Sequence, residues 1–361
     1  MTNPANVQAA SLRQASVVRE RRHAAARRQK IFYAVLLVIA LLAPLAVYPV
    51  FLMKLLCFAL FACAFNLLLG YAGLLSFGHA AFFATGGYIT GYMLSSYSGL
   101  STELGILAGT LASTVLGGLF GMLAIRRQGI YFAMITLALA QLVFFVFVQA
   151  PFTGGENGLQ GVPRGHLFGL VDMKNNMAMY YFVLAVFVIG FAIIQRTIHS
   201  PYGQVLKAIR ENEPRAVSLG YNVDRHKLLA FVISAALAGL AGATKTVVFQ
   251  LASLTDAHWH MSGEVILMTL LGGVGTILGP LVGATVVVTL QSSLSNGPLG
   301  EWVHVILGVI FVLCVLLFPL RHRRLAGAAG EAQLQVAIRC GTVQIAPDGP
   351  AIGEPAAGIH A

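Results

Sequence analysis

The sequence predicts an all-α membrane protein, a polytopic transmembrane helical bundle. Three observations carry this prediction: 57% of the 361 residues are hydrophobic, only 10% are charged, and the mean hydropathy is +0.79. A soluble domain usually carries about 25% charged residues, so lipid must solvate much of this apolar surface. The apolar runs are about 20 residues long, which suits a membrane-spanning helix and is about twice the length of a barrel strand.

Eight apolar runs are expected to cross the membrane completely as helices, because an unpaired backbone group in lipid is costly. In chain order they are Ile31–Tyr48, Phe51–Leu69, Ala80–Tyr97, Leu104–Ile125, Ile130–Gln149, Ala178–Gln195, Leu228–Phe249 and Trp302–Leu320. A further apolar segment, Glu264–Leu290, is interrupted by a glycine-rich stretch. It is expected to dip in and return as a hairpin of two half-helices, or to cross twice, so eight to ten spans are possible.

The basic residues set the orientation and the domain limits. They cluster beside the apolar runs, as in cytoplasmic loops that follow the positive-inside rule. Eight full spans place every cluster, and both termini, in the cytoplasm. The net charge of +10 therefore indicates membrane topology, and no nucleic-acid partner is expected. Residues 1–30 form a basic cytoplasmic arm, 31–320 the transmembrane domain, and 321–361 a tail whose Ala, Gly and Pro content predicts disorder.

No enzyme motif is present. The sequence lacks G-x-x-x-x-G-K-[ST] and H-E-x-x-H, and the four cysteines include no C-x-x-C pair. His258 and His260 have no companion ligands, so neither a metal site nor a cofactor is predicted. No Asp or Glu falls in the middle of a span, and Lys245 is close enough to a span end to reach the interface. This scarcity argues against a proton- or sodium-coupled carrier.

Two glycine-rich interruptions are candidates for a translocation pathway. They are Gly70-Tyr-Ala-Gly-Leu-Leu-Ser-Phe-Gly-His79 and Leu271-Gly-Gly-Val-Gly-Thr-Ile-Leu-Gly-Pro280. Broken segments in corresponding positions of two halves point to such a pathway. The candidate residues are Gly73, Ser76, Gly78, His79, Gly272, Gly273 and Gly275. Close helix packing is the alternative, since glycines spaced as in Gly117-x-x-x-Gly121 let helices approach, and His79 is expected to be a hydrogen-bonded structural residue.

The basic segment 196–227 contains two predicted short helices between Ser200 and Gly220. Pro214 suits the first position of the second helix, Glu213 its positive dipole end, and Gly220 its C-terminal cap. Val205, Leu206 and Ile209 give the first helix an apolar face, and Val217 does so for the second. Such a loop is a docking element for a soluble partner. The alternative is a basic linker attracted to anionic membrane lipid.

Five motifs together resemble the branched-chain amino acid ABC-transporter permease family, over about 31–320. They are Asn66-Leu-Leu-Leu-Gly-Tyr-Ala-Gly-Leu-Leu-Ser-Phe-Gly-His-Ala-Ala-Phe-Phe83, Tyr131-Phe-Ala-Met-Ile-Thr-Leu-Ala138, Thr153-Gly-Gly-Glu-Asn-Gly-Leu159, the segment from Leu206 to Gly220, and the second interruption. The resemblance implies a bacterial inner-membrane importer. In it, two related permeases form the pore, two ATPase subunits bind beneath, and a periplasmic binding protein delivers the ligand.

The resemblance also implies roles for particular residues. Arg210, Glu211, Glu213, Ala216 and Gly220 would lie in a groove of the ATPase, although Asn212 and Pro214 interrupt the Glu-Ala-Ala pattern of other importers. The outer loop carrying Thr153, Gly154, Gly155 and Asn157 would face the binding protein. Leucine, isoleucine and valine are the implied substrates. Urea or short amides remain an alternative, and an ion-coupled secondary carrier is a more distant one.

Overall fold

The computed structural model describes residues 33–97, 101–127, 129–167, 171–173 and 175–295, with short stretches between 302 and 316. The chain forms two compact units, Met1–Val303 and His304–Ala361, and the helices described below belong to the first. The predicted arm at 1–30, the tail at 321–361 and most of the span expected at Trp302–Leu320 lie outside the described residues.

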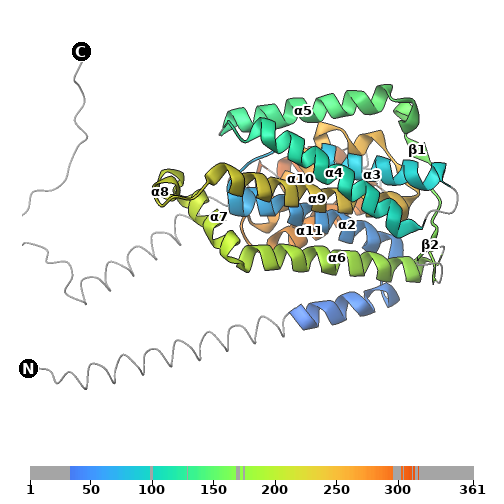
Figure 1. Ribbon diagram of the computed structural model, residues 1–361. Helices are drawn as coiled ribbons and strands as arrows, with labels where there is room; N and C mark the ends of the chain where they lie inside the picture. Colours follow the sequence, from blue (N-terminus) through green and yellow to red (C-terminus); the bar gives the residue numbers. More distant parts are fainter. Residues whose placement is uncertain are drawn as a thin grey trace, which may run out of the picture. The chain divides into compact units, whose positions relative to one another are not determined.

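The first unit is a bundle of long apolar helices (Figure 1). Five of the described helices are long and apolar enough to cross a membrane: α2 with its π-helical continuation (Pro49–Ala72), α4 (Thr102–Ala124), α5 (Ile130–Gln149), α6 (Asn176–His199) and α9 (Val223–Phe249). A shorter apolar helix covers Tyr33–Leu45, and α3 covers His79–Ser96. The all-α membrane bundle is thus confirmed, whereas the expected eight full spans are not.

Helix α9 packs against α2, α3 and α4, and this contact forms the core. Small residues allow the approach: a Cβ added to Gly86 on α3 would lie 2.2 Å from the Gly239 carbonyl oxygen on α9. A Cβ on Gly117 of α4 would lie 2.3 Å from that of Ala235. Any larger residue would separate these helices, so glycine serves helix packing here.

Both glycine-rich interruptions are breaks between helices. At the first break, α2 (Pro49–Asn66) continues as the π-helix η2 (Leu67–Ala72), and α3 begins at His79 after a non-helical stretch. The second break separates α10 (Trp259–Gly272) from α11 (Gly279–Ser295), which pack against each other. The 14 residues of α10 rise about 21 Å, less than the roughly 30 Å hydrocarbon thickness.

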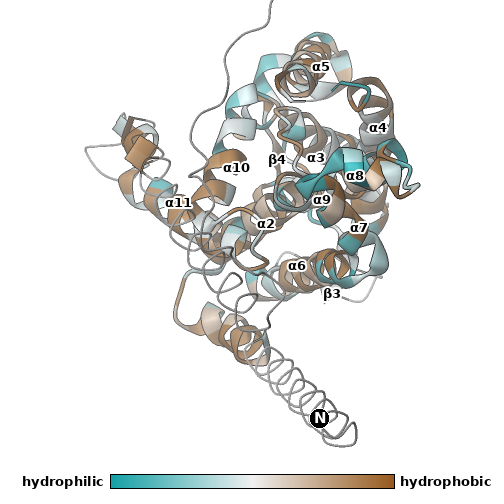
Figure 2. Cartoon of the chain, turned by 90° about the vertical axis from the view of Figure 1, so that its left-hand side faces the viewer, coloured by the Kyte–Doolittle hydropathy of each residue, from teal (hydrophilic) through white to brown (hydrophobic). Residues whose placement is uncertain are grey.

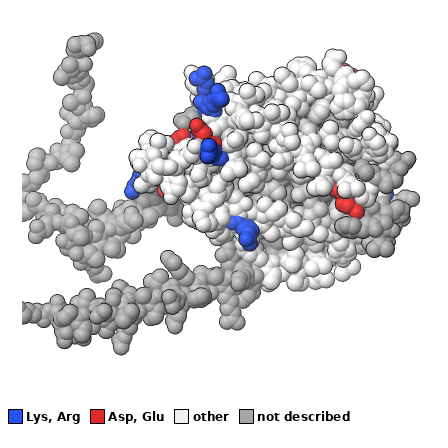
Figure 3. Space-filling model, viewed as in Figure 1, with Lys and Arg blue, Asp and Glu red and all other residues white. Residues whose placement is uncertain are grey.

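Opposite ends of the bundle carry different structures (Figure 1). Helices α7 (Pro201–Glu211) and α8 (Glu213–Ser218) lie at one end, where Lys and Arg side chains gather (Figure 3). Figure 2 shows hydrophilic residues on α8 and α7, facing the viewer. The other end holds β1 (Leu159–Gln160) paired antiparallel with β4 (Leu251–Ala252), and β2 (His166–Leu167) paired with β3 (Val171–Asp172). We call these the basic end and the β end.

Candidate functional site

Helices α7 and α8 form a capped helical pair at the basic end. Ser200 caps α7 by accepting from the Gly203 amide at 3.3 Å, and Asn212 caps α8 by accepting from the Arg215 amide at 3.1 Å. The predicted helix starts were therefore nearly right, but α8 begins at Glu213, so Pro214 is its second residue. Asn212 and Pro214, which interrupt the Glu-Ala-Ala pattern, together start the second helix.

Gly220 ends α8 in a left-handed conformation, with φ of +84°. Its amide donates to Val217 O at 2.9 Å, and the Tyr221 amide donates to Ala216 O at 3.2 Å. These two bonds define a Schellman motif, in which glycine is the usual residue after the cap. Gly220 is thus needed for the shape of the loop.

A small apolar core holds the pair together. Ile209, Ala216 and Val223 are buried, with Val205 partly buried against them. The expectation that Val217 forms the apolar face of α8 was wrong: Ala216 is 2% exposed, whereas Val217 is 58% exposed. One residue of register in a helix turns the side chain by about 100°, so the observed start of α8 buries Ala216.

Glu213 forms an ion pair with Lys227 on α9, at 2.8 Å between Oε1 and Nζ. The Lys227 side chain is only 5% exposed and that of Glu213 is 28% exposed. Nearby, the Tyr202 hydroxyl donates to His226 O at 2.8 Å, and burial raises the pKa of this phenol. Both contacts tie the helical pair to the start of α9. Glu211 is exposed.

Arg210 connects α7 to both interruptions. Its guanidinium donates to the Gly70 carbonyl oxygen in η2. A Cβ added to Gly73 would lie 3.0 Å from Arg210 Cγ, and one added to Gly275 would lie 3.2 Å from Arg210 Nη1. Gly73 and Gly275 have φ of +73° and +78°, so both backbones adopt a conformation that suits glycine. Arg210 thus connects three features that were predicted separately: the docking loop and the two glycine-rich interruptions.

Asn66 ties the two interruptions to each other, and sequence reasoning assigned it no role. Its Nδ2 donates to Thr276 O at 2.8 Å, and its Oδ1 accepts from the Gly275 amide at 3.0 Å. The side chain is 3% exposed. A polar amide within an otherwise apolar run is the signal that could have identified it.

The remaining pathway candidates lie deeper in the packing. Ser76 is buried and accepts from the Gly78 amide at 3.1 Å. His79 is also buried; its Nε2 lies 2.8 Å from Ser234 Oγ, which donates to Ala64 O. Because the Ser234 hydroxyl proton is donated to Ala64 O, His79 must donate from Nε2 to Ser234 Oγ. The His79 ring lies among the rings of Phe65, Phe82 and Phe231. In the second interruption, Gly272 approaches Gly279, and Gly273 has φ of +101°.

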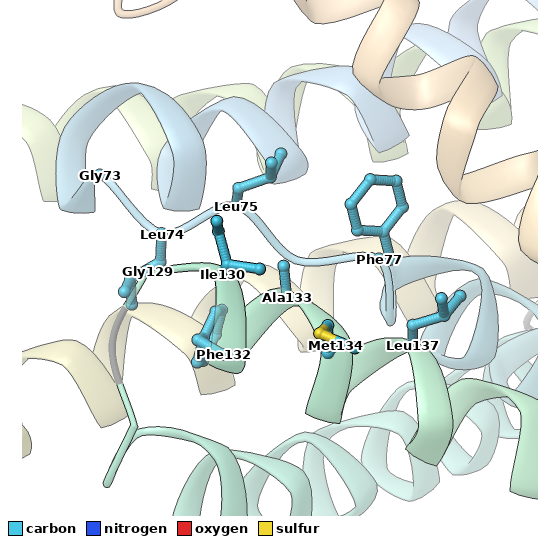
Figure 4. Close-up of a pocket in the computed structure, with 10 residues that line it drawn as sticks. All are labelled: Gly73, Leu74, Leu75, Phe77, Gly129, Ile130, Phe132, Ala133, Met134 and Leu137. Carbon is cyan, nitrogen blue, oxygen red and sulfur yellow. The ribbon is translucent and has the colours of Figure 1, made fainter.

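An apolar groove of about 450 Å³ borders the first interruption. Figure 4 shows the stretch from Gly73 to Phe77 passing over the first turns of α5, with Ile130 and Ala133 pointing from α5 toward it and Leu75 pointing away from α5. Gly73 therefore lies both on this groove and against Arg210, whereas Ser76, Gly78 and His79 do not line it. Its volume is within the range of about 300–1,000 Å³ usual for small-molecule sites.

The loop at the β end begins with two turns, η3 (Pro151–Thr153) and η4 (Gly155–Asn157). Thr153 is buried and its hydroxyl donates to Ala150 O at 2.7 Å, while Gly154 and Asn157 are exposed. Farther along, Arg164 donates to Val247 O and Val248 O at the end of α9, and burial lowers its pKa. The loop is therefore anchored on α9 and presents Gly154 and Asn157 at its surface.

Lys245, four residues before the end of α9, forms an ion pair with Asp256 on η5 (Leu254–Asp256). Lys54 on α2 is half-buried, and no role was predicted for it. Among the described residues, no group of three or more His, Cys, Asp or Glu side chains could hold a metal ion.

Known proteins resemble the chain over most of its length. A family model for the permease component of branched-chain amino acid transport systems matches residues 49–315. The high-affinity branched-chain amino acid transport system permease proteins LivM of Salmonella typhimurium and Escherichia coli are 28% and 29% identical to it. These alignments cover 85% and 81% of this chain, and 79% and 74% of the relatives.

A further relative, the permease protein LivH of Escherichia coli, is 23% identical over 73% of this chain and 89% of its own length. No solved structure matches the chain. Because the family model covers far more than half of the residues, and the bundle has several helices able to cross a membrane, the chain belongs to the branched-chain amino acid transport permease family.

Proposed function

We propose that this chain is one membrane-spanning permease subunit of an ABC importer that translocates leucine, isoleucine and valine. A related permease completes the pore, two ATPase subunits drive transport, and a periplasmic binding protein delivers the ligand. The bacterial inner membrane holds the complex, with the basic end in the cytoplasm. The single observation that supports the proposal most is the position of Arg210, on the helix proposed to meet the ATPase and in contact with both glycine breaks.

Arg210 provides a short mechanical route from the ATPase to the pathway. A shift of α7 would move the guanidinium, and with it the Gly70 carbonyl and the neighbouring backbone of Gly73 and Gly275. Gly70 lies in the last turn of η2, whereas Gly73 and Gly275 lie outside the helices, so the backbone of these two glycines can move without disrupting a helix. Rigid packed helices with mobile joints between them are the usual elements of such transitions.

The ATPase contact is best assigned to the exposed residues of the loop. Val217 and Leu219 are 58% and 67% exposed, and they form an apolar tip on α8 and its cap. Arg210 and Glu211, the last two residues of α7, are also exposed. Ala216 is buried and Glu213 is held by Lys227, so these two residues shape the loop.

The groove in Figure 4 suits the aliphatic side chain of a branched-chain amino acid, because its lining is almost entirely hydrocarbon. Urea or a short amide would leave hydrogen-bonding groups unpaired there, at a cost in binding. Gly154 and Asn157 at the opposite end are proposed to meet the binding protein.

The test is transport by the complete complex in proteoliposomes. We expect leucine uptake that needs both ATP and the binding protein. Uptake of urea but not leucine would change the ligand and keep the importer class. Leucine uptake driven by an ion gradient without ATP would contradict the proposal.

A further inference from the structure

Another apolar groove, of about 470 Å³, lies between the N-terminal helix (Tyr33–Leu45) and the rest of the bundle. Its other walls come from α2, α6 and α11, and we call it the N-terminal groove. Along the N-terminal helix its lining extends from Tyr33 to Ala43, a rise of about 15 Å. This is half of the roughly 30 Å hydrocarbon thickness of a bilayer, which is the depth that the lipid tails of one leaflet fill.

Two contacts fix the N-terminal helix against α6, toward opposite ends of the groove. The rings of Tyr33 and Phe191 meet edge to face, with their centres 6.0 Å apart. The Tyr180 hydroxyl donates to Ala40 O at 2.5 Å. The two helices therefore run antiparallel beside each other (Figure 1). An empty space of this size between them would deprive its lining of the dispersion contacts of close packing.

The lining of the groove is hydrocarbon apart from four side chains, Tyr33, Tyr180, Gln195 and Thr285. Two of them, Tyr180 and Thr285, already donate their hydroxyl protons to backbone carbonyl groups. A polar ligand would find too few partners in such a groove and would bind at a cost. A methylene chain needs no partners and gains free energy with every CH₂ that it buries. The groove therefore suits a lipid tail.

The sequence places basic residues beside the end of the groove that lies toward the basic end. Gln195 lines the groove four residues before the end of α6, which leads into α7. The next residue, Arg196, is exposed. In the sequence, six Lys or Arg residues and one Glu lie between positions 19 and 30, shortly before the N-terminal helix. Basic clusters beside membrane helices attract anionic head groups, so charge complementarity favours an anionic lipid over a neutral one.

We propose that the N-terminal groove binds one tail of an anionic phospholipid from the leaflet at the basic end, and that Arg196 pairs with its phosphate. The tail packs on the hydrocarbon walls between the N-terminal helix and α6 and supplies the contacts that an empty groove would lack. The phosphate accepts from the Arg196 guanidinium in a charge-assisted hydrogen bond. The bound lipid thereby joins the N-terminal helix to the rest of the bundle.

This inference goes beyond the proposed importer function and does not depend on the transported ligand. The matching family model begins at residue 49, so the N-terminal helix and the basic residues before it lie outside the matched region. The inference also gives those basic residues a role that transport does not require. Their charge raises the local concentration of anionic lipid beside the groove.

The experiment uses the complete complex in proteoliposomes and two photoreactive probes, phosphatidylglycerol and phosphatidylcholine, each with a diazirine on the same tail. Mass spectrometry locates the labelled residues. We expect phosphatidylglycerol to label the groove walls more than phosphatidylcholine does. Ala192→Phe fills the groove with a ring and should remove this labelling. Ala185→Phe, at an exposed position of α6 outside the lining, is the matched control and should leave the labelling unchanged.

A charge substitution tests the head-group contact separately. Arg196→Gln should lower the preference for phosphatidylglycerol over phosphatidylcholine about fivefold, the usual contribution of one basic residue near an anionic surface. Because Arg196 is exposed, this variant tests the site without altering the packing of the N-terminal helix. The control Arg127→Gln removes an exposed arginine that does not line the groove, and it should keep the preference.

Each of three results would overturn the inference. Equal labelling of the groove by the two probes in the parent shows that the site selects no anionic head group. Unchanged groove labelling in Ala192→Phe, or an equal loss in Ala185→Phe, shows that the lipid tail does not lie in the groove. Groove labelling that appears in this chain alone, and not in the complete complex, shows that a protein partner covers the groove instead of lipid.

Discussion

Arg210 on α7 donates a hydrogen bond to the Gly70 carbonyl oxygen, although 140 positions separate the two residues. The bond joins a helix at the basic end to the π-helical end of α2, where regular hydrogen bonding gives way to the first break. The last carbonyl groups of a helix have no partner within that helix, and Gly70 lies in the last turn of η2. The Gly70 carbonyl is therefore free to accept from a side chain of another segment.

Replacing Arg210 by Ala should uncouple transport from ATP hydrolysis. We expect leucine uptake to fall about tenfold, a usual size for coupling between two sites, while the ATPase subunits still copurify. Uptake and ATP hydrolysis are measured on the same proteoliposomes. Arg127→Ala, which removes an exposed arginine that makes no comparable contact with the described residues, is the control. Unchanged uptake in Arg210→Ala would show that this bond has no part in coupling.

A methyl group at Gly73 should disturb the same contact from the other side. Gly73→Ala strains a backbone with φ of +73° by about 1–2 kcal/mol and places a Cβ 3.0 Å from Arg210 Cγ. Gly161→Ala has the same kind of strain, at φ of +69°, but its Cβ would meet nothing within 4 Å. Thermal unfolding in detergent should show similar losses for both variants, whereas leucine uptake should fall only in Gly73→Ala. Equal uptake in the two variants would show that Gly73 takes no part in coupling ATP hydrolysis to transport.

The Asn66 bridge predicts a loss of stability. Asn66→Leu keeps a similar volume but leaves the Gly275 amide and the Thr276 carbonyl without their partner, which should cost about 1–3 kcal/mol. Thermal unfolding in detergent measures the change. The control Thr197→Val loses only a solvent-exposed bond to Ile193 O within the same helix, so a change below about 0.5 kcal/mol is expected. Equal effects in the two variants would contradict the role of Asn66.

The sequence predicts the helical parts of the bundle well because apolar runs of spanning length have few alternatives in lipid. The range predicted for the fifth span, Ile130–Gln149, is the observed α5, and α3 begins one residue before its predicted start. The long-range contacts were not predictable in this way. Asn66 and Gly275 lie 209 positions apart, and no local pattern indicates that they meet.

The loop at the basic end shows a second limit of sequence reasoning. Its two helices, their cap at Gly220 and the apolar face of α7 were predicted, and the structure confirms them. The buried face of α8 was not predicted, because a helix of six residues is too short to show a hydrophobic periodicity. Which of its residues are buried depends on where the Asn212 cap starts the helix. The ion pair of Glu213 with Lys227 also depends on how α8 folds back on α9.

That ion pair decides how substitutions of Glu213 should be interpreted. Lys227 is 5% exposed, so Glu213→Gln leaves a buried ammonium without its counter-charge, and we expect a loss of about 1–2 kcal/mol of stability, reduced by the partial exposure of Glu213. Lys227→Met removes the charge and should largely cancel the effect of a subsequent Glu213→Gln. A double-mutant cycle from thermal unfolding in detergent measures this coupling.

If the two changes are additive, the ion pair contributes nothing to stability, and a transport defect in Glu213→Gln then comes from a direct contact with the ATPase. If they are strongly coupled, Glu213 acts by holding α8 against α9, and the contact with the ATPase belongs to exposed residues such as Val217 and Leu219.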